Sequence, residues 1–275
     1  MGWFPKFRIA QKLPLAMVAT ALLVSAGVGL GSYLVGSTIV AEMSARQMHT
    51  VASSHADEFT TYLRTIQSDL VSSATTESSV TAVRDFAIAW KNFAKATPPL
   101  DPVIVLRDSF LTNNRYPAGQ RQMLDVNDKG RTNYDATHDK VQATLRRKLE
   151  AQGYVDLYMF DIAGNLIYSV MKNDDFAQNF AEGGALADTG LGRVFRKALA
   201  LTERGQVAYE DASIYPVSGM PASFLATPMF DPRGKLMGVM AFQMPVAPIN
   251  QMLQDNTYLG ETGESFIVGA DRLLR

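Results

Sequence analysis

The sequence predicts an α+β fold: a membrane-spanning helix and a long helix after it, followed by a five-stranded antiparallel sheet backed by helices. Three observations carry this prediction: an uncharged apolar run near the N-terminus, a helical repeat of apolar residues behind it, and a later alternation of helical segments with short β-rich runs. The 275 residues carry a net charge of −1 and no cysteine. Zinc–thiolate sites, iron–sulfur clusters and disulfides are therefore excluded, and nothing in the net charge favours binding to nucleic acid.

The uncharged run covers residues 13–40, 28 positions in all. As a helix it would be about 42 Å long, enough to cross a hydrocarbon core of roughly 30 Å with tilt. A cleaved signal peptide is the alternative, although its apolar region is normally only about 7–15 residues long. Lys6, Arg8 and Lys12 precede the run, so we expect residues 1–12 in the cytoplasm, a single pass through the inner membrane, and residues 41–275 in the periplasm or outside the cell.

Beyond the membrane, no Pro or Gly interrupts residues 41–95. Apolar residues and one histidine recur there at helical spacing, at Met48, Ala52, His55, Phe59, Tyr62, Ile66 and Leu70. The stripe predicts a helix–helix contact over residues 45–75, made either with a second copy of the chain in a homodimer or with the chain's own later helices. A second helix is expected from Val80 to Phe93, and residues 100–133 are expected to be irregular.

The last part of the chain alternates between the two element types. In chain order we expect a helix at 134–151, strands at 154–160 and 166–171, a helix at 191–201, and strands at 206–210, 222–230 and 235–244. The stretch 211–221 is expected to be rich in turns. Short connections join neighbouring strands, which indicates antiparallel hairpins.

No catalytic motif is present in the sequence. Residues 125–130 resemble a calcium loop, but Lys129 and Ala136 stand where oxygen ligands are needed. The glycine run at 183–192 lacks the spacing of a phosphate loop. Adjacent acids such as Asp174 and Asp175 are expected to be solvated in a loop. With three histidines in the chain, a histidine metal site is hard to build, so the sequence predicts neither an enzyme, nor a metal, nor a cofactor.

Several segments nevertheless carry a resemblance to a known family. They are GYVDLYMFD at 153–161, DTGLG at 188–192, PASF at 221–224 and GVMAFQMP at 238–245. Together with the membrane anchor and the long helix, they resemble the double Cache, PAS-like extracellular sensory region of methyl-accepting chemotaxis proteins, which sensor kinases and receptor cyclases also carry. The segment GETGESFIVG at 260–269 resembles the opening of the second Cache unit.

The resemblance implies a domain plan and a function. Residues 1–12 would be cytoplasmic, 13–40 transmembrane and 41–133 a helical stalk with an irregular region. Residues 134–254 would form the first Cache domain and 255–275 the start of a second one, so that the chain is a fragment or the product of a truncated gene. The implied function is the small-molecule sensor region of a chemoreceptor. The alternatives are the sensory region of a histidine kinase or receptor cyclase, and a ligand-free dimerisation module.

The resemblance also places a ligand pocket between one face of the sheet and the loops that follow its second and third strands. Candidate binding residues by position are Tyr158, Tyr168, Lys172, Tyr209, Asp211 and Tyr215. Lys172 would suit a ligand carboxylate, and Asp211 an amine or hydroxyl group. Against this, strand tyrosines often serve only the core, and Asp211 could simply begin a turn.

Amino-acid-binding members of the family carry an Arg-x-Trp-Tyr pattern and then Tyr-x-Asp. This chain has KNDDF at 172–176 in the first place and matches only the second, with YED at 209–211. The sequence therefore leaves open whether an amino acid is the ligand.

Overall fold

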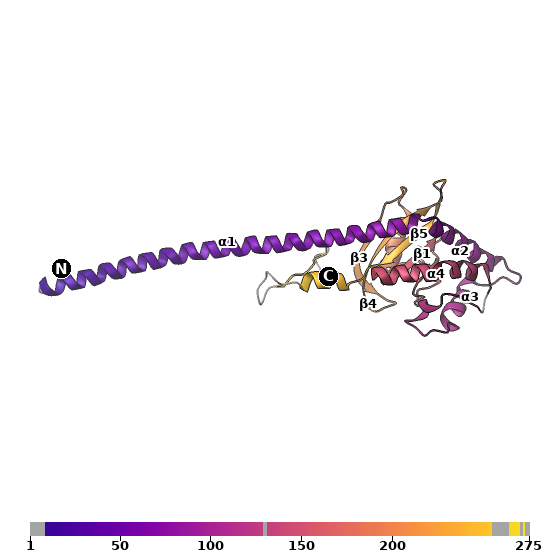
Figure 1. Cartoon of the computed structure of the whole chain (residues 1–275), viewed down its shortest axis with the longest axis horizontal. Coiled ribbons are helices and arrows are strands. Elements are labelled where there is room, and N and C mark those ends of the chain that lie inside the picture. The colour runs from indigo at the N-terminus through magenta and orange to yellow at the C-terminus, as the bar shows by residue number, and fades with distance from the viewer. Residues whose placement is uncertain (1–8, 129–130, 255–263, 270–271, 273–275) are drawn as a thin grey trace. The chain divides into compact units, whose positions relative to one another are not determined.

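The structure is a computed structural model that describes residues 9–128, 131–254, 264–269 and 272. The chain divides into two compact units, Met1–Asp57 with Asp255–Ser265, and Glu58–Gln254 with Phe266–Arg275. The first helix, α1 (Ile9–Thr75), has 67 residues and contributes to both units (Figure 1). Residues 1–8 and most of the predicted second Cache segment at 255–275 lie outside the described residues.

In the first unit, α1 exposes its large apolar side chains from Ile9 to Met48, and Leu23, for example, is 73% exposed, whereas Val51 is buried. Two threonine hydroxyl groups are bonded within the helix: Thr20 Oγ1 donates to the Ala16 carbonyl at 2.9 Å and Thr38 Oγ1 to the Leu34 carbonyl at 2.8 Å. Such internal pairing is what a hydrocarbon environment requires. The helix is long and apolar enough to cross a membrane.

In the second unit, the C-terminal part of α1 packs against its own domain. Ile66 and Leu70 of the predicted stripe are buried in the domain core, whereas Met48 is 64% exposed. Two hydrogen bonds fix this part of the helix: the Tyr62 hydroxyl donates to the Pro245 carbonyl at 3.2 Å, and the Tyr154 hydroxyl to Asp69 Oδ2 at 2.6 Å. The membrane-distal half of the stripe, which contains Ile66 and Leu70, therefore packs against the chain's own domain and not against a second copy.

The second helix, α2 (Glu77–Lys95), begins after an N-cap at Thr76 and contains the predicted helical stretch from Val80 to Phe93. The prediction that residues 100–133 are irregular is wrong in part. They form α3 (Pro102–Arg107), a π-helical turn η1 (Asp108–Thr112) and a 3-10 turn η2 (Arg121–Met123). The cause of α3 is local: proline stands at its first position, and the Asp101 carboxylate accepts the Val103 N–H at 2.8 Å.

Helix α4 (Asn133–Gln152) is bounded by clear signals at both ends. Thr132 and Asp135 form a capping box, and Gly153 ends the helix in the left-handed region with φ of 71°. The helix therefore agrees with the predicted range of 134–151 to within one residue at either end.

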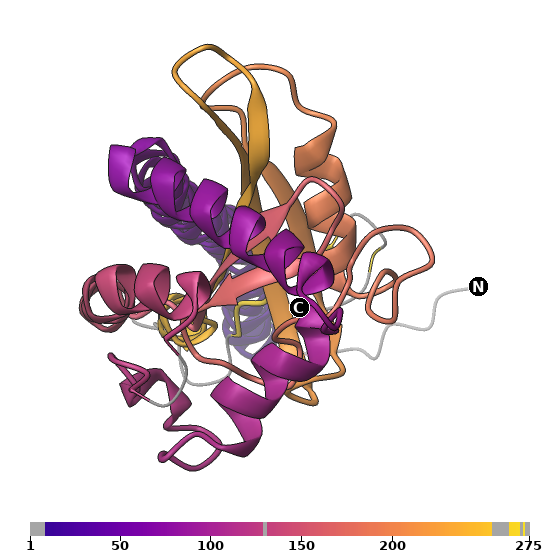
Figure 2. The ribbon, with the colours of Figure 1, turned by 90° about the vertical axis from the view of Figure 1, so that its right-hand side faces the viewer.

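The sheet contains β1 (Asp156–Asp161), β2 (Leu166–Ser169), β3 (Ala208–Tyr215), β4 (Met220–Phe230) and β5 (Leu236–Gln243). All neighbours are antiparallel, in the order β2-β1-β5-β4-β3. Helix α5 (Gly190–Leu199) lies between β2 and β3 in the chain, and α6 (Ala247–Gln254) follows β5. This arrangement confirms the predicted α+β, PAS-like fold (Figure 2).

The stretch 211–221 is not the turn-rich region that the sequence predicts. Strand β3 continues to Tyr215, and β4 already begins at Met220. The pairing of β3 with β4 shifts between Glu210 and Ser213, so Asp211 lies in a bulge within a strand rather than at the start of a turn.

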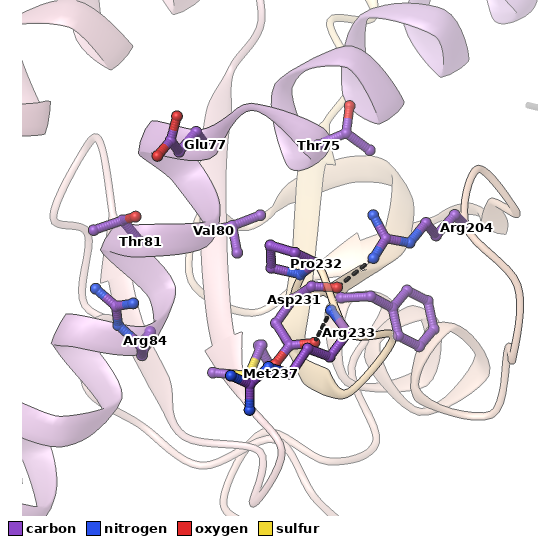
Figure 3. Close-up of a pocket in the computed structure, with 11 residues that line it drawn as sticks. Thr75, Glu77, Val80, Thr81, Arg84, Arg204, Asp231, Pro232, Arg233 and Met237 are labelled. Carbon is purple, nitrogen blue, oxygen red and sulfur yellow. Dashed lines mark hydrogen bonds between the residues drawn. The ribbon is translucent and has the colours of Figure 1, made fainter.

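The turn between β4 and β5 lies beside the start of α2 (Figure 3). Asp231 organises this turn, because its Oδ1 accepts the N–H groups of Arg233 and Lys235, each at 2.9 Å. The result is a well-defined hairpin next to the junction of α1 and α2.

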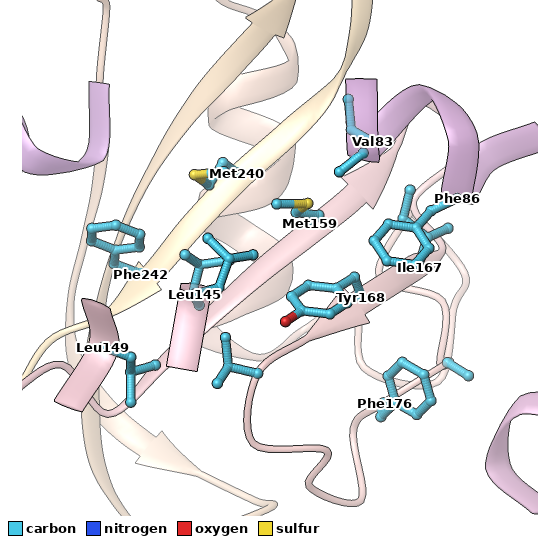
Figure 4. Close-up of a cluster of buried hydrophobic side chains, with 14 of the residues drawn as sticks. Val83, Phe86, Leu145, Leu149, Met159, Ile167, Tyr168, Phe176, Met240 and Phe242 are labelled. Carbon is cyan, nitrogen blue, oxygen red and sulfur yellow. The ribbon is translucent and has the colours of Figure 1, made fainter. Parts of the chain in front are cut away.

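Helices cover both faces of the sheet, α2 and α4 on one and α5 on the other (Figure 2). The α2/α4 face packs Phe86, Tyr134, Met159 and Tyr168 into one core (Figure 4), and the α5 face packs Phe160, Phe195 and Phe224 into a second. Gly238 permits the close approach of α2, because a Cβ there would lie 2.9 Å from Val83 Cγ2 and 2.1 Å from the Phe160 carbonyl oxygen.

Candidate functional site

Five buried polar side chains gather at one end of the α5 face of the sheet, and we call them the polar cluster. They are Asp156 and Tyr158 of β1, Asp175 of the segment after β2, Tyr215 of β3 and Gln243 of β5. None is more than 7% exposed. Two hydrogen bonds run through the cluster, from the Tyr158 hydroxyl to Gln243 Oε1 at 2.9 Å and from the Tyr215 hydroxyl to Asp175 Oδ2 at 2.6 Å.

Strand alternation explains why these side chains share one face. In β1, Leu157 and Met159 enter the α2/α4 core, so Asp156 and Tyr158 point the other way. Gln243 is the register partner of Asp156, which places its side chain on the same face. The cluster is therefore assembled by the pairing of the central strands and not by a single motif.

Each of the two carboxylates has one oxygen without a hydrogen-bond partner among the described residues. Asp156 Oδ1 accepts three backbone N–H groups, those of Leu157 at 2.7 Å, Val170 at 3.0 Å and Met171 at 3.1 Å, but Oδ2 accepts none. Asp175 Oδ2 accepts the Tyr215 hydroxyl, and Oδ1 has no partner. Leaving buried polar atoms unpaired is costly, so these two oxygens call for an explanation.

The electrostatics of the cluster are those of two acids held away from water. Burial raises the pKa of Asp156 well above its ordinary value, and the charge of Asp175 raises it further. Burial also raises the pKa of Asp175, to about 6, against the opposing effect of the Tyr215 hydrogen bond. A site of this kind favours a group that is positively charged or donates hydrogen bonds.

Backbone strain marks the segment that carries Asp175. Lys172 and Ala177, on either side of it, have positive φ values of 54° and 63°. Both are buried and neither is glycine. Strained positions of this kind persist only where the surroundings hold them, and they cluster at ligand sites.

Two arginines from the region between α2 and α4 hold this segment in place. Arg107 Nη1 donates to the carbonyls of Asp174 at 2.7 Å and Phe176 at 2.9 Å, and Arg121 Nη1 donates to the carbonyl of Lys172 at 3.1 Å. The bonds lie on both sides of the buried carboxylate, so its position is set before any ligand arrives.

Of the predicted site residues, only Tyr158 and Tyr215 belong to the polar cluster. Tyr168 and Lys172 lie together on the α2/α4 side, where the Tyr168 hydroxyl donates to Gln142 Oε1 at 2.7 Å. Tyr209 and Asp211 lie together on the edge strand β3, with the Tyr209 hydroxyl donating to Asp211 Oδ1 at 3.3 Å. The six candidates thus fall into three pairs in three places.

Lys172 is bound internally. Its Nζ donates to the Ser169 carbonyl and to Gln142 Oε1 at 3.4 Å, and it lies 4.1 Å from the centre of the Tyr168 ring and 5.2 Å from that of Phe176. Burial lowers its pKa to about 7. These contacts give the ammonium group partners within the fold, in contrast to the two acids of the polar cluster.

Asp156, Asp175 and Gln243 were not among the site residues predicted from the sequence. Asp156 carried a signal, because it is a charged residue directly before the apolar run at residues 157–160. Asp175 was expected to be solvated with its neighbour Asp174. That prediction is correct for the Asp174 side chain, which is 74% exposed, and wrong for Asp175, which is fully buried.

No family model matches the sequence, and no curated protein matches it. Among solved structures, the chain is similar to the sensor domain of the V. cholerae histidine kinase DctB, with 15% identity over 63% of this chain and 59% of that one and a TM-score of 0.33. It is also similar to the ligand-binding domain of the Campylobacter jejuni chemoreceptor Tlp3 in complex with 4-methylisoleucine, with 11% identity over 69% of both chains and a TM-score of 0.37.

A third similar structure is the ligand-binding domain of the Pseudomonas aeruginosa amino acid chemoreceptor PctC in complex with GABA. It has 15% identity over 54% of this chain and 57% of that one, with a TM-score of 0.35. The chain spans 59% of the DctB structure and 57% of the PctC structure. Each of the three is the sensor or ligand-binding domain of a histidine kinase or a chemoreceptor. The fold described above rests on the strand order and helix positions of this chain, not on these remote similarities.

Proposed function

We propose that this chain is the extracytoplasmic sensory region of a transmembrane chemoreceptor and that the polar cluster binds its small-molecule ligand. The observation that carries the proposal is the pair of buried carboxylate oxygens without partners, Asp156 Oδ2 and Asp175 Oδ1. A fold rarely keeps two such atoms unless something outside the chain completes their hydrogen bonds. The sensory region of a histidine kinase or receptor cyclase is the alternative output.

The chemistry of the cluster defines the ligand. Two acids accept hydrogen bonds from an ammonium group or a hydroxyl group, and charge-assisted bonds of this kind are the stronger ones. The aromatic rings of Tyr158, Tyr215 and Phe224 supply apolar walls. We therefore propose a small amine, with or without a further polar group, as the ligand.

A thermal-shift screen of the full chain in detergent micelles tests this proposal. The probes are ethanolamine, putrescine, choline and γ-aminobutyrate, with acetate as the compound without a cationic group. We expect at least one amine to raise the melting temperature of the wild type and of Asp174→Asn, the exposed neighbour. The same amine should not stabilise Asp175→Asn or Asp156→Asn. An amine that stabilises all four proteins equally would place its site elsewhere.

The membrane topology is part of the proposal: residues 1–12 inside, one span at 13–40 and residues 41–275 in the periplasm. The uncharged run and its basic flank support it. Alkaline phosphatase, active only outside the cytoplasm, fused after residue 150 should be active. A green fluorescent protein at the same position should stay dark after export through the general secretion route. The opposite result would reverse the topology.

We also propose that the chain forms a homodimer through the part of the apolar stripe nearest the membrane, at Met48 and Ala52. Met48 and Ala52 are exposed, whereas Ile66 is only 1% exposed in the domain core. Because the chain has no cysteine, single cysteines report contacts cleanly. We expect Met48→Cys and Ala52→Cys to form crosslinked dimers in membranes faster than Ser53→Cys. Equal rates at all three positions would exclude a specific seam.

A further inference from the structure

A cavity of about 470 Å³ lies at the junction of α1 and α2. Three segments line it: the end of α1 with the start of α2, the loop after α5, and the β4–β5 turn (Figure 3). Its volume falls within the roughly 300–1,000 Å³ usual for small-molecule sites. None of its lining residues belongs to the polar cluster.

The lining carries a small excess of positive charge. Arg84, Arg204 and Arg233 all contribute, with Arg84 and Arg204 on opposite sides of Pro232 in Figure 3. The acids of the lining are Glu77 and Asp231, which leaves a formal charge of +3 − 2 = +1.

Most of the acidic groups near the cavity already have partners. The Asp231 carboxylate accepts two backbone N–H groups of its own turn. Asp85, outside the lining, pairs with Arg84 Nε at 3.0 Å. Arg204 donates to the Asp231 carbonyl and not to a carboxylate. The Arg233 guanidinium makes no hydrogen bond or ion pair with the described residues, so its five N–H donors are available to a ligand.

Apolar groups complete the lining, namely Val80, Phe230, Pro232 and Met237. Guanidinium groups match the geometry of carboxylate and phosphate oxygens, and an apolar wall accepts a hydrocarbon or aromatic body. We propose that this cavity is a second binding site, for an organic anion in which a carboxylate or phosphate group is attached to an apolar body. Glu77 weakens binding there, because its carboxylate opposes the charge of the ligand.

Isothermal titration calorimetry on the full chain in detergent micelles tests the proposal. The probe is phenyl phosphate; phenol supplies the apolar body alone and inorganic phosphate the anion alone. We expect phenyl phosphate to bind more tightly than either. Arg233→Gln should weaken it roughly tenfold, the effect of losing one charge-assisted interaction. Glu77→Gln should strengthen it several-fold, and Arg147→Gln, an exposed arginine on α4, should leave it unchanged.

Arg204→Gln is a second variant, but Arg233→Gln is the cleaner test because the Arg233 guanidinium supports no contact of the fold. Circular dichroism and the melting temperature show that each variant is folded. Absence of phenyl phosphate binding, binding equal to that of phenol, or equal affinity in wild type, Arg233→Gln and Glu77→Gln would each overturn the proposal. Asp175→Asn should leave phenyl phosphate binding intact, so this inference and the proposed amine site can fail separately.

Discussion

The two faces of the sheet differ in how far their buried polar groups are hydrogen-bonded. On the α2/α4 face, the Tyr134 hydroxyl donates to the Ile167 carbonyl at 2.7 Å, the Tyr168 hydroxyl to Gln142 Oε1, and Gln142 Nε2 to the carbonyls of Gln122 and Val170. The only buried side-chain oxygen without a partner on that side, among the described residues, belongs to the neutral amide of Gln122. On the α5 face, both unpartnered oxygens belong to acids.

This difference separates polar groups that build the fold from polar groups that are kept for a ligand. A satisfied network makes a core rigid and specific, whereas an unpaired buried acid destabilises it and persists only for another reason. Four variants test this difference between the two faces, and they are taken in order of decreasing change in stability.

Phe86→Ala should have the largest effect, because Phe86 is fully buried on the α2/α4 face and lies 5.1 Å from the Tyr168 ring and 4.8 Å from the Tyr134 ring. We expect a loss of about 3–5 kcal/mol in the free energy of unfolding. Ile88→Ala, at a position of α2 that is 50% exposed, should change it by less than about 0.5 kcal/mol. Chemical denaturation of the full chain measures both, and similar losses would show that this face is not the structural one.

Lys172→Met should remove a dependence of stability on pH. Burial lowers the pKa of Lys172 to about 7, below the value of the unfolded chain, so the unfolded state binds more protons between pH 7 and pH 10. Wild-type stability should therefore rise by roughly 3 kcal/mol from pH 7 to pH 9.5. The rise should be absent in Lys172→Met and retained in Lys140→Met, an exposed lysine of α4. An unchanged slope in Lys172→Met would mean that Lys172 stays charged in the fold.

Asp175→Asn should show the opposite dependence on the α5 face. The pKa of Asp175 is raised to about 6, so its contribution to stability is present below about pH 4 and is lost as the pH rises through 6. At pH 7 the variant should be more stable than the wild type by roughly 2–3 kcal/mol, and at pH 3.5 the gain should disappear.

Buried His138, whose pKa is lowered to about 4, titrates in the same range with the opposite sign. It is present in both proteins, so the difference between wild type and Asp175→Asn isolates the carboxyl group. Asp174→Asn is the control: it removes a 74% exposed carboxylate that pairs with Arg121 at 3.1 Å, and its stability should stay within about 1 kcal/mol of the wild type at both pH values. If Asp175→Asn were less stable than the wild type at pH 7, Asp175 would stabilise the fold, and the two faces would not differ in the way described above.

Tyr215→Phe should have the smallest effect, about 1 kcal/mol at pH 7, because it removes the one side-chain donor to Asp175. Tyr209→Phe, on the same strand but 38% exposed, should cost less than about 0.5 kcal/mol. Thermal unfolding resolves the two. A larger loss of stability in Tyr209→Phe than in Tyr215→Phe would mean that the hydrogen bond between Tyr209 and Asp211 on the edge strand matters more to the fold than the one between Tyr215 and Asp175.

The fold could be predicted largely from local signals. Gly153, for example, ends α4 within the turn that it closes. The start of α3 at Pro102 depends on an equally local signal, but α3 was not predicted. Where prediction failed, at Asp211, a residue typical of turns lies in a bulge whose pairing partner is on another strand. Single positions cannot reveal such a bulge.

The candidate site was less predictable, for a physical reason. Tyr158 and Tyr215 could be selected by position, Tyr158 on the first predicted hairpin and Tyr215 in the stretch after the third predicted strand. Asp175, by contrast, is buried because Arg107 and Arg121 bind the backbone on either side of it from 50 or more positions earlier in the chain. Adjacent Asp174 has the same side chain and faces solvent, so residue type alone could not separate the two.

The hydrogen bond between Tyr62 and Pro245 has a mechanical consequence. Gln243 of the polar cluster is followed directly by Met244 and Pro245, and the Pro245 carbonyl accepts the hydroxyl of Tyr62 on α1. Two residues of main chain and one hydrogen bond therefore connect the polar cluster to α1. Met244 between them is buried in the α2/α4 core, and its N–H donates to the Ser223 carbonyl at 3.0 Å, so a displacement of Gln243 would act on β4 and on α1 together.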